Sequence, residues 1–244
     1  MNTEEQHIHN LLKEIPIFWI NLDRTESRRT KMLDQFNKYN LKNTRVSAVD
    51  GNNINLEEYN VKYNINSKMN KYEVACALSH INTIKMSYDQ GLEYALILED
   101  DANFDYFPYK TQPILDLLIE LKKENGECLQ LANIISRKLF PRIDFNKTLI
   151  KMKDVAGAQA YLITKQGMKK VLDNFENNKN IEVSEHMIFN IANNFVTAPY
   201  FSYPFLKNEN GEILNSSNIR EDTREAHKTQ TISKNLWDEY YNHV

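Results

Sequence analysis

Three consecutive carboxylates, Glu99, Asp100 and Asp101, are the residues of this chain with the clearest capacity for chemistry. They follow directly after Tyr94-Ala95-Leu96-Ile97-Leu98, an apolar run typical of a strand buried on both faces of a parallel sheet. Open α/β sheets bind ligands at the carboxyl ends of their strands. Adjacent carboxylates repel one another, and a hard divalent cation shared with a substrate phosphate would relieve that repulsion. The alternative is an acidic turn exposed to water, so the surrounding elements have to be considered.

Two further strands end in polar residues. The apolar run at 15–22 predicts a first strand, and the run at 44–49 predicts a second one that stops at a strong turn signal. Each polar end alone is more typical of an ordinary cap or turn, but the carboxyl ends of parallel strands meet at one edge of a sheet. Their coincidence with the acidic triplet therefore predicts a nucleotide site. The candidate residues at these two ends are Asn21, Asp23, Arg24, Asp50 and Gly51.

The elements that must position these residues alternate along the chain. Hydrophobic spacing and turn residues predict strands at 15–22, 44–49, 94–98, 127–131, 156–164 and 196–203, and helices at 3–14, 24–39, 73–90, 114–123, 165–175 and 184–195. The polar stretch 52–70 is predicted to be a loop. This alternation of strands and helices predicts the α/β class, with a Rossmann-like, mostly parallel sheet flanked by helices in a single domain. We expect an N-terminal extension at 1–14, the domain at 15–220, and a tail at 221–244 whose Leu236-Trp237 docks.

Composition excludes several classes of protein. With 41% apolar residues and 11% aromatics the chain is globular, and its formal net charge of −3 argues against a nucleic-acid partner. The two cysteines, Cys76 and Cys128, have no zinc-like spacing and are interpreted as small buried hydrophobic residues. The chain has no apolar run of 18 residues and no signal-peptide pattern, so we expect no membrane span and a cytoplasmic location.

The basic residues and the lone helical histidine remain open to two interpretations. No glycine-rich phosphate loop is present, which argues against dinucleotide oxidoreductases and P-loop hydrolases. A bound phosphate would then need a metal and a basic residue such as Arg24, Arg28 or Arg29, although Arg28 and Arg29 individually are expected to be solvated. His80, beside Ser79, could be structural or could lie at a donor site.

Several ordered blocks of the sequence resemble glycosyltransferase family 25, which contains bacterial lipooligosaccharide galactosyltransferases and procollagen galactosyltransferases. The resemblance spans about 15–220, and four blocks in order make a specific signal. The matching blocks are I-F-W-I-N-L-D-R at 17–24, A-V-D-G at 48–51, E-V-A-C-A-L-S-H at 73–80 and A-L-I-L-E-D-D-A at 95–102, with further matches in G-A-Q-A-Y-L-I-T at 157–164, Gly167 and Ser217-Asn218-Ile219.

The resemblance implies a GT-A-type fold, a UDP-sugar donor, Mn²⁺ and inversion at the anomeric carbon. By motif, Asn21, Asp23 and Arg24 would line the uridine end with Asp50 and Gly51 nearby, and Ser79 and His80 would flank the donor. Glu99, Asp100 and Asp101 would be the equivalent of the D-x-D motif, and E-D-D fits this family's form of it. Asp101 is then the first choice for direct metal contact and for catalysis, Asp100 is the second metal ligand, and Glu99 is a donor-site residue.

The chain departs from the family pattern at two places. Where the family carries a valine-aspartate pair at the start of a late helix, this chain has Val183 followed by Ser184 and Glu185. Ser184 is interpreted as a helix N-cap, and Glu185 is a shifted candidate for the acceptor base. Ala132 stands where a glycine is expected.

The resemblance and the acidic triplet together predict a metal-dependent hexosyltransferase. It would move galactose or glucose from a UDP-sugar to a hydroxyl of a glycan or a hydroxylysine-type protein acceptor. A catalytically silent member that binds a glycan or nucleotide-sugar is the alternative, motivated by the missing aspartate. A metal-dependent phosphoesterase ranks below both.

Overall fold

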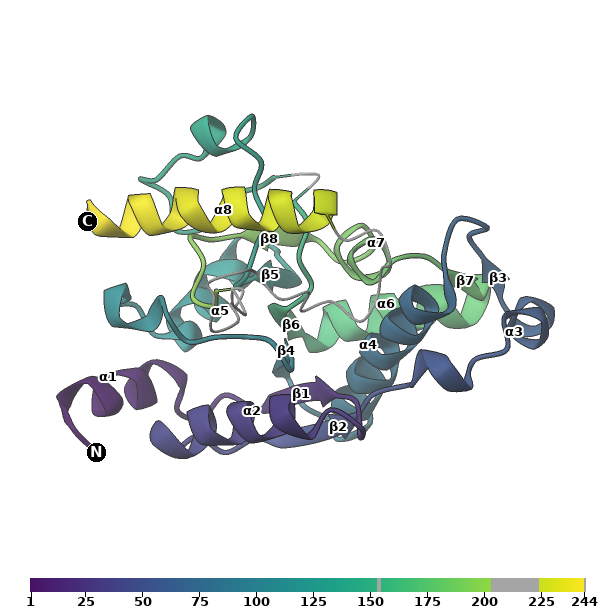
Figure 1. The fold of residues 1–244 in the computed structure, drawn as a ribbon. Coiled ribbons are helices and arrows are strands. Elements are labelled where there is room, and N and C mark those ends of the chain that lie inside the picture. The colour runs from purple at the N-terminus through teal and green to yellow at the C-terminus, as the bar shows by residue number, and fades with distance from the viewer. Residues whose placement is uncertain (153–154, 203–223, 244) are drawn as a thin grey trace.

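The main structural element is a six-stranded sheet with strand order β2-β1-β4-β6-β5-β8 (Figure 1). A computed structural model describes residues 1–152, 155–202 and 224–243. The strands of the sheet are β1 (Ile17–Asn21), β2 (Thr44–Ser47), β4 (Tyr94–Glu99), β5 (Cys128–Gln130), β6 (Ala160–Thr164) and β8 (Asn194–Val196). A separate two-stranded pair is formed by β3 (Asn64–Ile65) and β7 (Asn180–Ile181).

Five of the six strands run in one direction. β1 is parallel to β2 and β4, and β5 is parallel to β8, whereas β6 is antiparallel to both of its neighbours. This confirms the predicted α/β, mostly parallel sheet. The reversal of β6 places its first residues beside the last residues of β4, because Leu98 is paired with Ala160.

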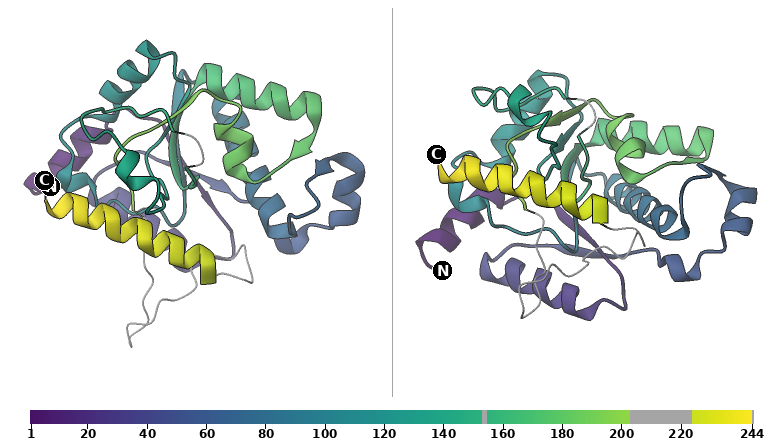
Figure 2. Two further views of the ribbon diagram at one scale, coloured as in Figure 1. Left: turned by 90° about the horizontal axis from the view of Figure 1, so that it is seen from above. Right: turned by 45° about the horizontal axis from the view of Figure 1, so that its top comes forward.

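Helices cover both faces of the sheet (Figure 2). Side chains alternate across each strand, so Trp19 and Leu98 face one helical layer while Ile20 and Ile97 face the other. The first layer contains α1 (Thr3–Leu12), α2 (Glu26–Lys38) and α5 (Ile114–Lys123), and the second contains α4 (Lys71–Asp89), α6 (Lys165–Asn178) and α7 (Ser184–Phe189). Within the described ranges, no helix combines the length and apolarity that crossing a bilayer requires.

The C-terminal helix α8 (Arg224–Asn242) forms a third apolar cluster with the chain between β5 and β6. Trp237 is 2% exposed and packs there with Tyr241, Tyr106 and Ile143, which confirms the predicted docked end. The matching block Ser217-Asn218-Ile219 and the predicted boundary at 220 lie outside the described residues.

Four predicted elements were wrong in part. The strand predicted at 196–203 is instead β8 (Asn194–Val196), which ends where that prediction begins. The stretch 52–70 is not a loop throughout, because Asn55 caps a short helix, α3 (Leu56–Lys62), by accepting from the N–H of Glu57. The helix predicted at 184–195 ends at Phe189. It ends early because Asn193 bonds through its backbone to Glu127, which leads the chain into β8. The strand predicted at 156–164 begins only at Ala160.

Candidate functional site

The polar ends of β1, β2 and β4 lie side by side, as the sequence predicts. β1 is the central strand of the three, with Asn21 paired to Ser47 and Ile20 paired to Glu99. The carboxamide of Asn21 donates to Asp100 Oδ2 at 2.7 Å, which links the end of β1 to the turn after β4. We call this row of strand ends, with Glu99, Asp100 and Asp101, the acidic edge.

Asp100 is the carboxylate of the acidic edge that protein groups neutralise. Arg28, from the first turns of α2, places Nη1 2.5 Å from Asp100 Oδ1, and Thr25 and Asn21 lie around Oδ2. The side chain of Asp100 is only 9% exposed and that of Arg28 is 20% exposed. The expectation that Arg28 is solvated is therefore wrong: α2 turns this side chain toward the sheet, where it balances a buried charge.

Asp101 lacks such a partner at close range. Its nearest described cation is Nη2 of Arg28 at 3.9 Å, and its Oδ1 accepts from Nε2 of Gln159 at 2.9 Å. Burial, followed by repulsion from Glu99, raises the pKa of Asp101 to about 7. The side-chain oxygen of Gln159 is buried and accepts no hydrogen bond within the described structure. Gln159 contacts Asp101 and Glu99 lies near enough to repel it, so this part of the acidic edge holds oxygen-bearing side chains with an excess of negative charge, and a hard divalent cation prefers oxygen ligands of this kind.

A second group of side chains meets Glu99 from α4. His80 Nε2 lies 3.1 Å from Glu99 Oε1, and its Nδ1 lies 3.1 Å from the hydroxyl of Tyr161. One helical turn earlier lies Cys76, a residue of intermediate exposure, and the pKa of its thiol is raised by burial and then by the charges of Glu99 and Glu185. Cys76 therefore does not match its predicted role as a buried hydrophobic residue, whereas Cys128 is fully buried and does.

The start of α7 reaches this group through Ser184. Its hydroxyl donates to Glu185 Oε2 at 3.1 Å and lies 4.0 Å from the sulfur of Cys76. The prediction that Ser184 is the N-cap is wrong, because the cap position is Val183 and Ser184 is the first helical residue. Glu185 is partly buried and lies near enough to Cys76 to influence its titration.

The β1 and β2 ends are held by paired charges. Arg24 Nε lies 2.8 Å from Asp50 Oδ2, and Arg45 bonds to both Asp23 and the carboxamide of Asn21. A hydrogen bond from the backbone N–H of Asn52, and then the one from Arg24, lower the pKa of Asp50. Hydrogen bonds from Arg45 and then from Ser47 lower the pKa of Asp23. Both carboxylates are thus ionised and oriented by their neighbours.

Ser79 and Gly51 hold the backbone together at this edge. The hydroxyl of Ser79 accepts from the N–H of Val49 at 2.9 Å and donates to the carbonyl of Ala75 at 2.7 Å. Gly51 packs so closely against α4 that an added Cβ would lie 3.0 Å from the Cα of Tyr72. Their predicted contact with a donor remains a prediction, and in the structure they fix the turn after β2 against α4.

Three residues of the site were missed as functional candidates. Arg45 sits on β2 where side chains alternate between faces, and its contacts with Asn21 and Asp23 depend on strand pairing. Gln159 was visible as the polar residue in the block G-A-Q-A-Y-L-I-T, and Cys76 as a residue four positions before His80 on one helix face. Ala132, where a glycine was expected, is fully buried within the apolar core.

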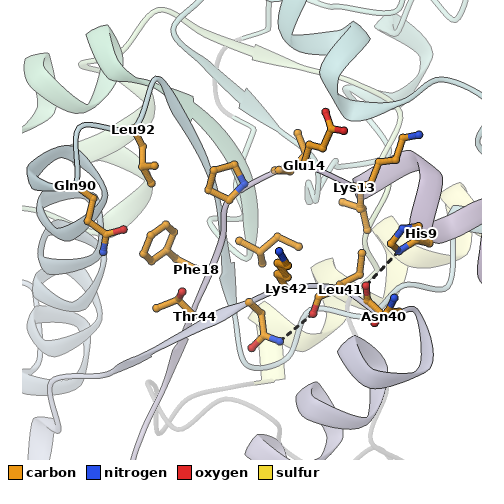
Figure 3. A pocket seen from close by; sticks show the side chains of 15 residues that line it. His9, Lys13, Glu14, Phe18, Asn40, Leu41, Lys42, Thr44, Gln90 and Leu92 are labelled. Atoms are coloured by element: carbon orange, nitrogen blue, oxygen red, sulfur yellow. Dashed lines mark hydrogen bonds between the residues drawn. The ribbon is translucent and has the colours of Figure 1, made fainter.

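A pocket of about 490 Å³ lies at the opposite end of the strands (Figure 3). It is lined by the chain entering β1, including Lys13 and Glu14, by Lys42 and Thr44 at the start of β2, and by Gln90 after α4. None of the predicted site residues lines it. The pocket is therefore separate from the acidic edge.

Comparison with known proteins supports the resemblance noted in the sequence. The family model described as "Glycosyltransferase family 25 (LPS biosynthesis protein)" matches residues 14–187. The chain is similar to a glycosyltransferase 25 family member of Aedes aegypti, 28% identical over 186 residues that cover 70% of this chain and 30% of the relative. It is also similar to procollagen galactosyltransferase 2 of Homo sapiens, 31% identical over 112 residues (41% of this chain, 18% of the relative), and to its Mus musculus counterpart, 33% identical over 101 residues (37% and 16%). The chain spans about a third or less of the length of these relatives.

Proposed function

The chain belongs to glycosyltransferase family 25, and on that premise we propose that it transfers a hexose, galactose or glucose, from a UDP-sugar to an acceptor hydroxyl. The observation that supports the proposal is that neighbouring carboxylates differ in their positively charged partners. Asp100 is neutralised by Arg28, whereas Asp101 and Glu99 carry negative charge without an equivalent partner. Such an excess of charge at the carboxyl end of a central strand suits a cation that in turn binds a diphosphate.

The residues present fit Mn²⁺ or a similar hard cation. Asp101 and Glu99 offer carboxylate oxygens, and Gln159 offers a buried carbonyl oxygen that lacks a described partner. Asp100, the second predicted ligand, already uses both oxygens with Arg28 and Asn21, so we assign it mainly to orienting the turn. When bound, the cation would act as a Lewis acid that stabilises the charge on the departing diphosphate.

Side chains of the protein would supply the acceptor base and position the donor. In an inverting transfer the acceptor oxygen forms a bond to the anomeric carbon as the bond from that carbon to the UDP oxygen breaks, and a base removes the acceptor proton. Glu185 is our candidate for this base, which typically contributes on the order of 10²–10⁴-fold in rate. Arg24 and Asp50, held in an ion pair near the end of β2, would position the uridine end with Asn21, Asp23 and Gly51.

A related proposal concerns the acceptor, and one alternative function has an observation in its favour. The acceptor would be a glycan or a hydroxylysine-type protein side chain, as the name of the human relative, a procollagen galactosyltransferase, suggests for that protein. The alternative function, a silent member that binds nucleotide-sugar without turnover, is motivated by Ser184 at the position where the resemblance predicts aspartate.

The test is Mn²⁺-dependent release of UDP from a panel of UDP-sugars, with and without acceptors. We expect Asp101→Asn to lower turnover by about 10²–10³-fold, because a neutral amide loses the charge that the cation requires. Asp34→Asn, at an exposed position of α2, is the matched control and should retain activity. UDP-sugar binding without release of UDP by the unmodified chain would instead favour the silent binding module.

A further inference from the structure

Cys76, His80 and Glu99 form a cluster of mixed donor atoms beside the acidic edge. The sulfur, the imidazole nitrogen and the carboxylate oxygen lie within 4.8 Å of one another. The cysteine and histidine are four residues apart on α4, so both project from the same face of one rigid helix. Glu99 reaches them from the end of β4, and its oxygen already lies 3.1 Å from His80 Nε2.

The donor types differ from those of the acidic edge. A thiolate and an imidazole favour borderline-soft ions such as Zn²⁺ and Co²⁺, whereas carboxylate and amide oxygens favour Mg²⁺ and Mn²⁺. Tetrahedral zinc with bonds of about 2.0–2.3 Å needs its donors closer together than they are here. His80 Nε2 and Glu99 Oε1 are already 3.1 Å apart, so only the sulfur of Cys76 has to move closer.

The surroundings of His80 suit a metal ligand. Its ring is 1% exposed, and the hydroxyl of Tyr161 at 3.1 Å from Nδ1 fixes the ring orientation. Metal-bound histidines are commonly held in this way through the nitrogen that does not bind the metal. Cys76 and Glu99 are both partly exposed, so an ion can reach the cluster from solvent.

From this geometry we propose that Cys76, His80 and Glu99 form a zinc-type site that shares Glu99 with the proposed catalytic cation. On binding, the thiol proton leaves to solvent, Nε2 of His80 becomes the ligand, and Nδ1–H donates to the Tyr161 oxygen. The three protein ligands leave the fourth position of a tetrahedral ion for water. If the proposed transferase activity is correct, occupation of this site draws Glu99 away from the catalytic cation and lowers turnover.

The direct test is titration of the metal-free protein with Co²⁺, without nucleotide, while the near-ultraviolet absorption is recorded. We expect a cobalt–thiolate charge-transfer band that saturates at one equivalent and is displaced by Zn²⁺. Cys76→Ser should abolish the band and weaken Zn²⁺ binding by about 100-fold, since a thiolate is among the strongest zinc ligands. Cys128→Ala removes the only other cysteine of the chain and should leave both signals intact.

A second measurement covers the case in which the serine variant does not fold. In the unmodified chain, Zn²⁺ should slow the alkylation of Cys76 by iodoacetamide at least tenfold, with the modified residue identified by mass spectrometry. The proposal is overturned if no charge-transfer band forms, if the band survives Cys76→Ser, or if Zn²⁺ leaves the alkylation rate unchanged.

The site and the proposed function can fail separately. Asp101→Asn should abolish sugar transfer but retain the cobalt–thiolate band, because Asp101 is not one of the three ligands. Loss of transfer with the band retained therefore tests only the enzyme, and absence of the band in an active enzyme rejects only the zinc site. In an active enzyme, the ratio of turnover with and without Zn²⁺ should approach one in Cys76→Ser.

Discussion

On the side of the acidic edge formed by β1, β2 and α2, Asp50 pairs with Arg24 and Asp100 pairs with Arg28. On the side formed by β4, β6 and α4, Asp101 and Glu99 meet a glutamine and a histidine, and burial with like charge raises the pKa of Asp101 to about 7. The first side is complete in the protein alone, and its ion pairs hold the strand ends in register. The second side carries charge that the described side chains do not balance. The carboxylates that are paired with arginine stabilise the site. Asp101 and Glu99, whose charge is less balanced, are the candidates for binding a ligand.

Removing Arg28, which pairs with Asp100, should have the largest effect on stability. Arg28→Met leaves the buried Asp100 without its cation, and breaking such a pair should lower the free energy of unfolding by about 3 kcal/mol. Urea denaturation measures the change. Arg29→Met, one residue further along α2 and partly exposed, should change stability by no more than about 0.5 kcal/mol. Equal effects of the two substitutions would show that the Arg28 pair is not a structural element.

Lys110 extends the comparison to a buried positive charge. Its Nζ donates to the carbonyl of Ala198 at 2.7 Å and lies 4.5 Å and 4.9 Å from the ring centres of Tyr200 and Tyr241, and burial lowers its pKa to about 7. The unfolded chain keeps a lysine pKa near 10.4, so it binds more protons than the folded chain between these values. Stability should therefore rise as the pH increases from about 7 to about 10, and the full penalty should be present below pH 7.

The substitution Lys110→Met should remove this pH dependence. We expect the substitution to raise the free energy of unfolding by about 3 kcal/mol more at pH 6 than at pH 9.5, since pH 9.5 lies about 2.5 units above the folded pKa and each pKa unit corresponds to about 1.4 kcal/mol. Denaturation at the two pH values measures this difference. Lys123→Met, at an exposed position of α5, is the control. A parallel pH profile for Lys110→Met and the unmodified chain would contradict the prediction.

Substitutions of the two adjacent aspartates should change the free energy of unfolding in opposite directions, and by less than the substitution of Arg28. In metal-free protein at pH 8, Asp100→Asn should destabilise by about 1–2 kcal/mol because Arg28 loses a charge-assisted hydrogen bond. Asp101→Asn should stabilise by about 1 kcal/mol because it removes a buried charge and ends the repulsion from Glu99. The raised pKa of Asp101 makes its penalty grow as the pH rises from about 4 to about 7, so this gain should disappear at low pH. Thermal unfolding of the two variants measures both effects, and shifts of the same sign would contradict the contrast.

The main elements of the site could be predicted because their signals are local. The apolar run before Glu99 and the capping residues Asn70 and Glu73 of α4 define their strand and helix within a few residues of sequence. The parallel order of β1, β2 and β4 followed from the alternation of helices and strands, and it brought the predicted polar ends together.

The balance of charge at the site could not be predicted in the same way. Arg28 meets Asp100 across 72 positions of sequence and Gln159 meets Asp101 across 58, so these contacts depend on how α2 and β6 pack against β4. The early end of α7 had a similar cause, because Asn193 is drawn into pairing with Glu127, 66 residues away. The helical pattern of a local sequence contains no information about hydrogen bonds that a distant strand will offer to the same residues.

The reversed direction of β6 determines which part of the chain borders the acidic edge. An antiparallel strand brings its beginning to that edge, so the segment between Gln130 and Ala160 starts and finishes at the same end of the sheet. In its described residues this segment contributes no strand to the six-stranded sheet, and Ile135, Ile143 and Ile150 pack in the same apolar cluster as Trp237 of α8. Its last residue, Gln159, contacts Asp101. One segment therefore connects the C-terminal helix to the acidic edge.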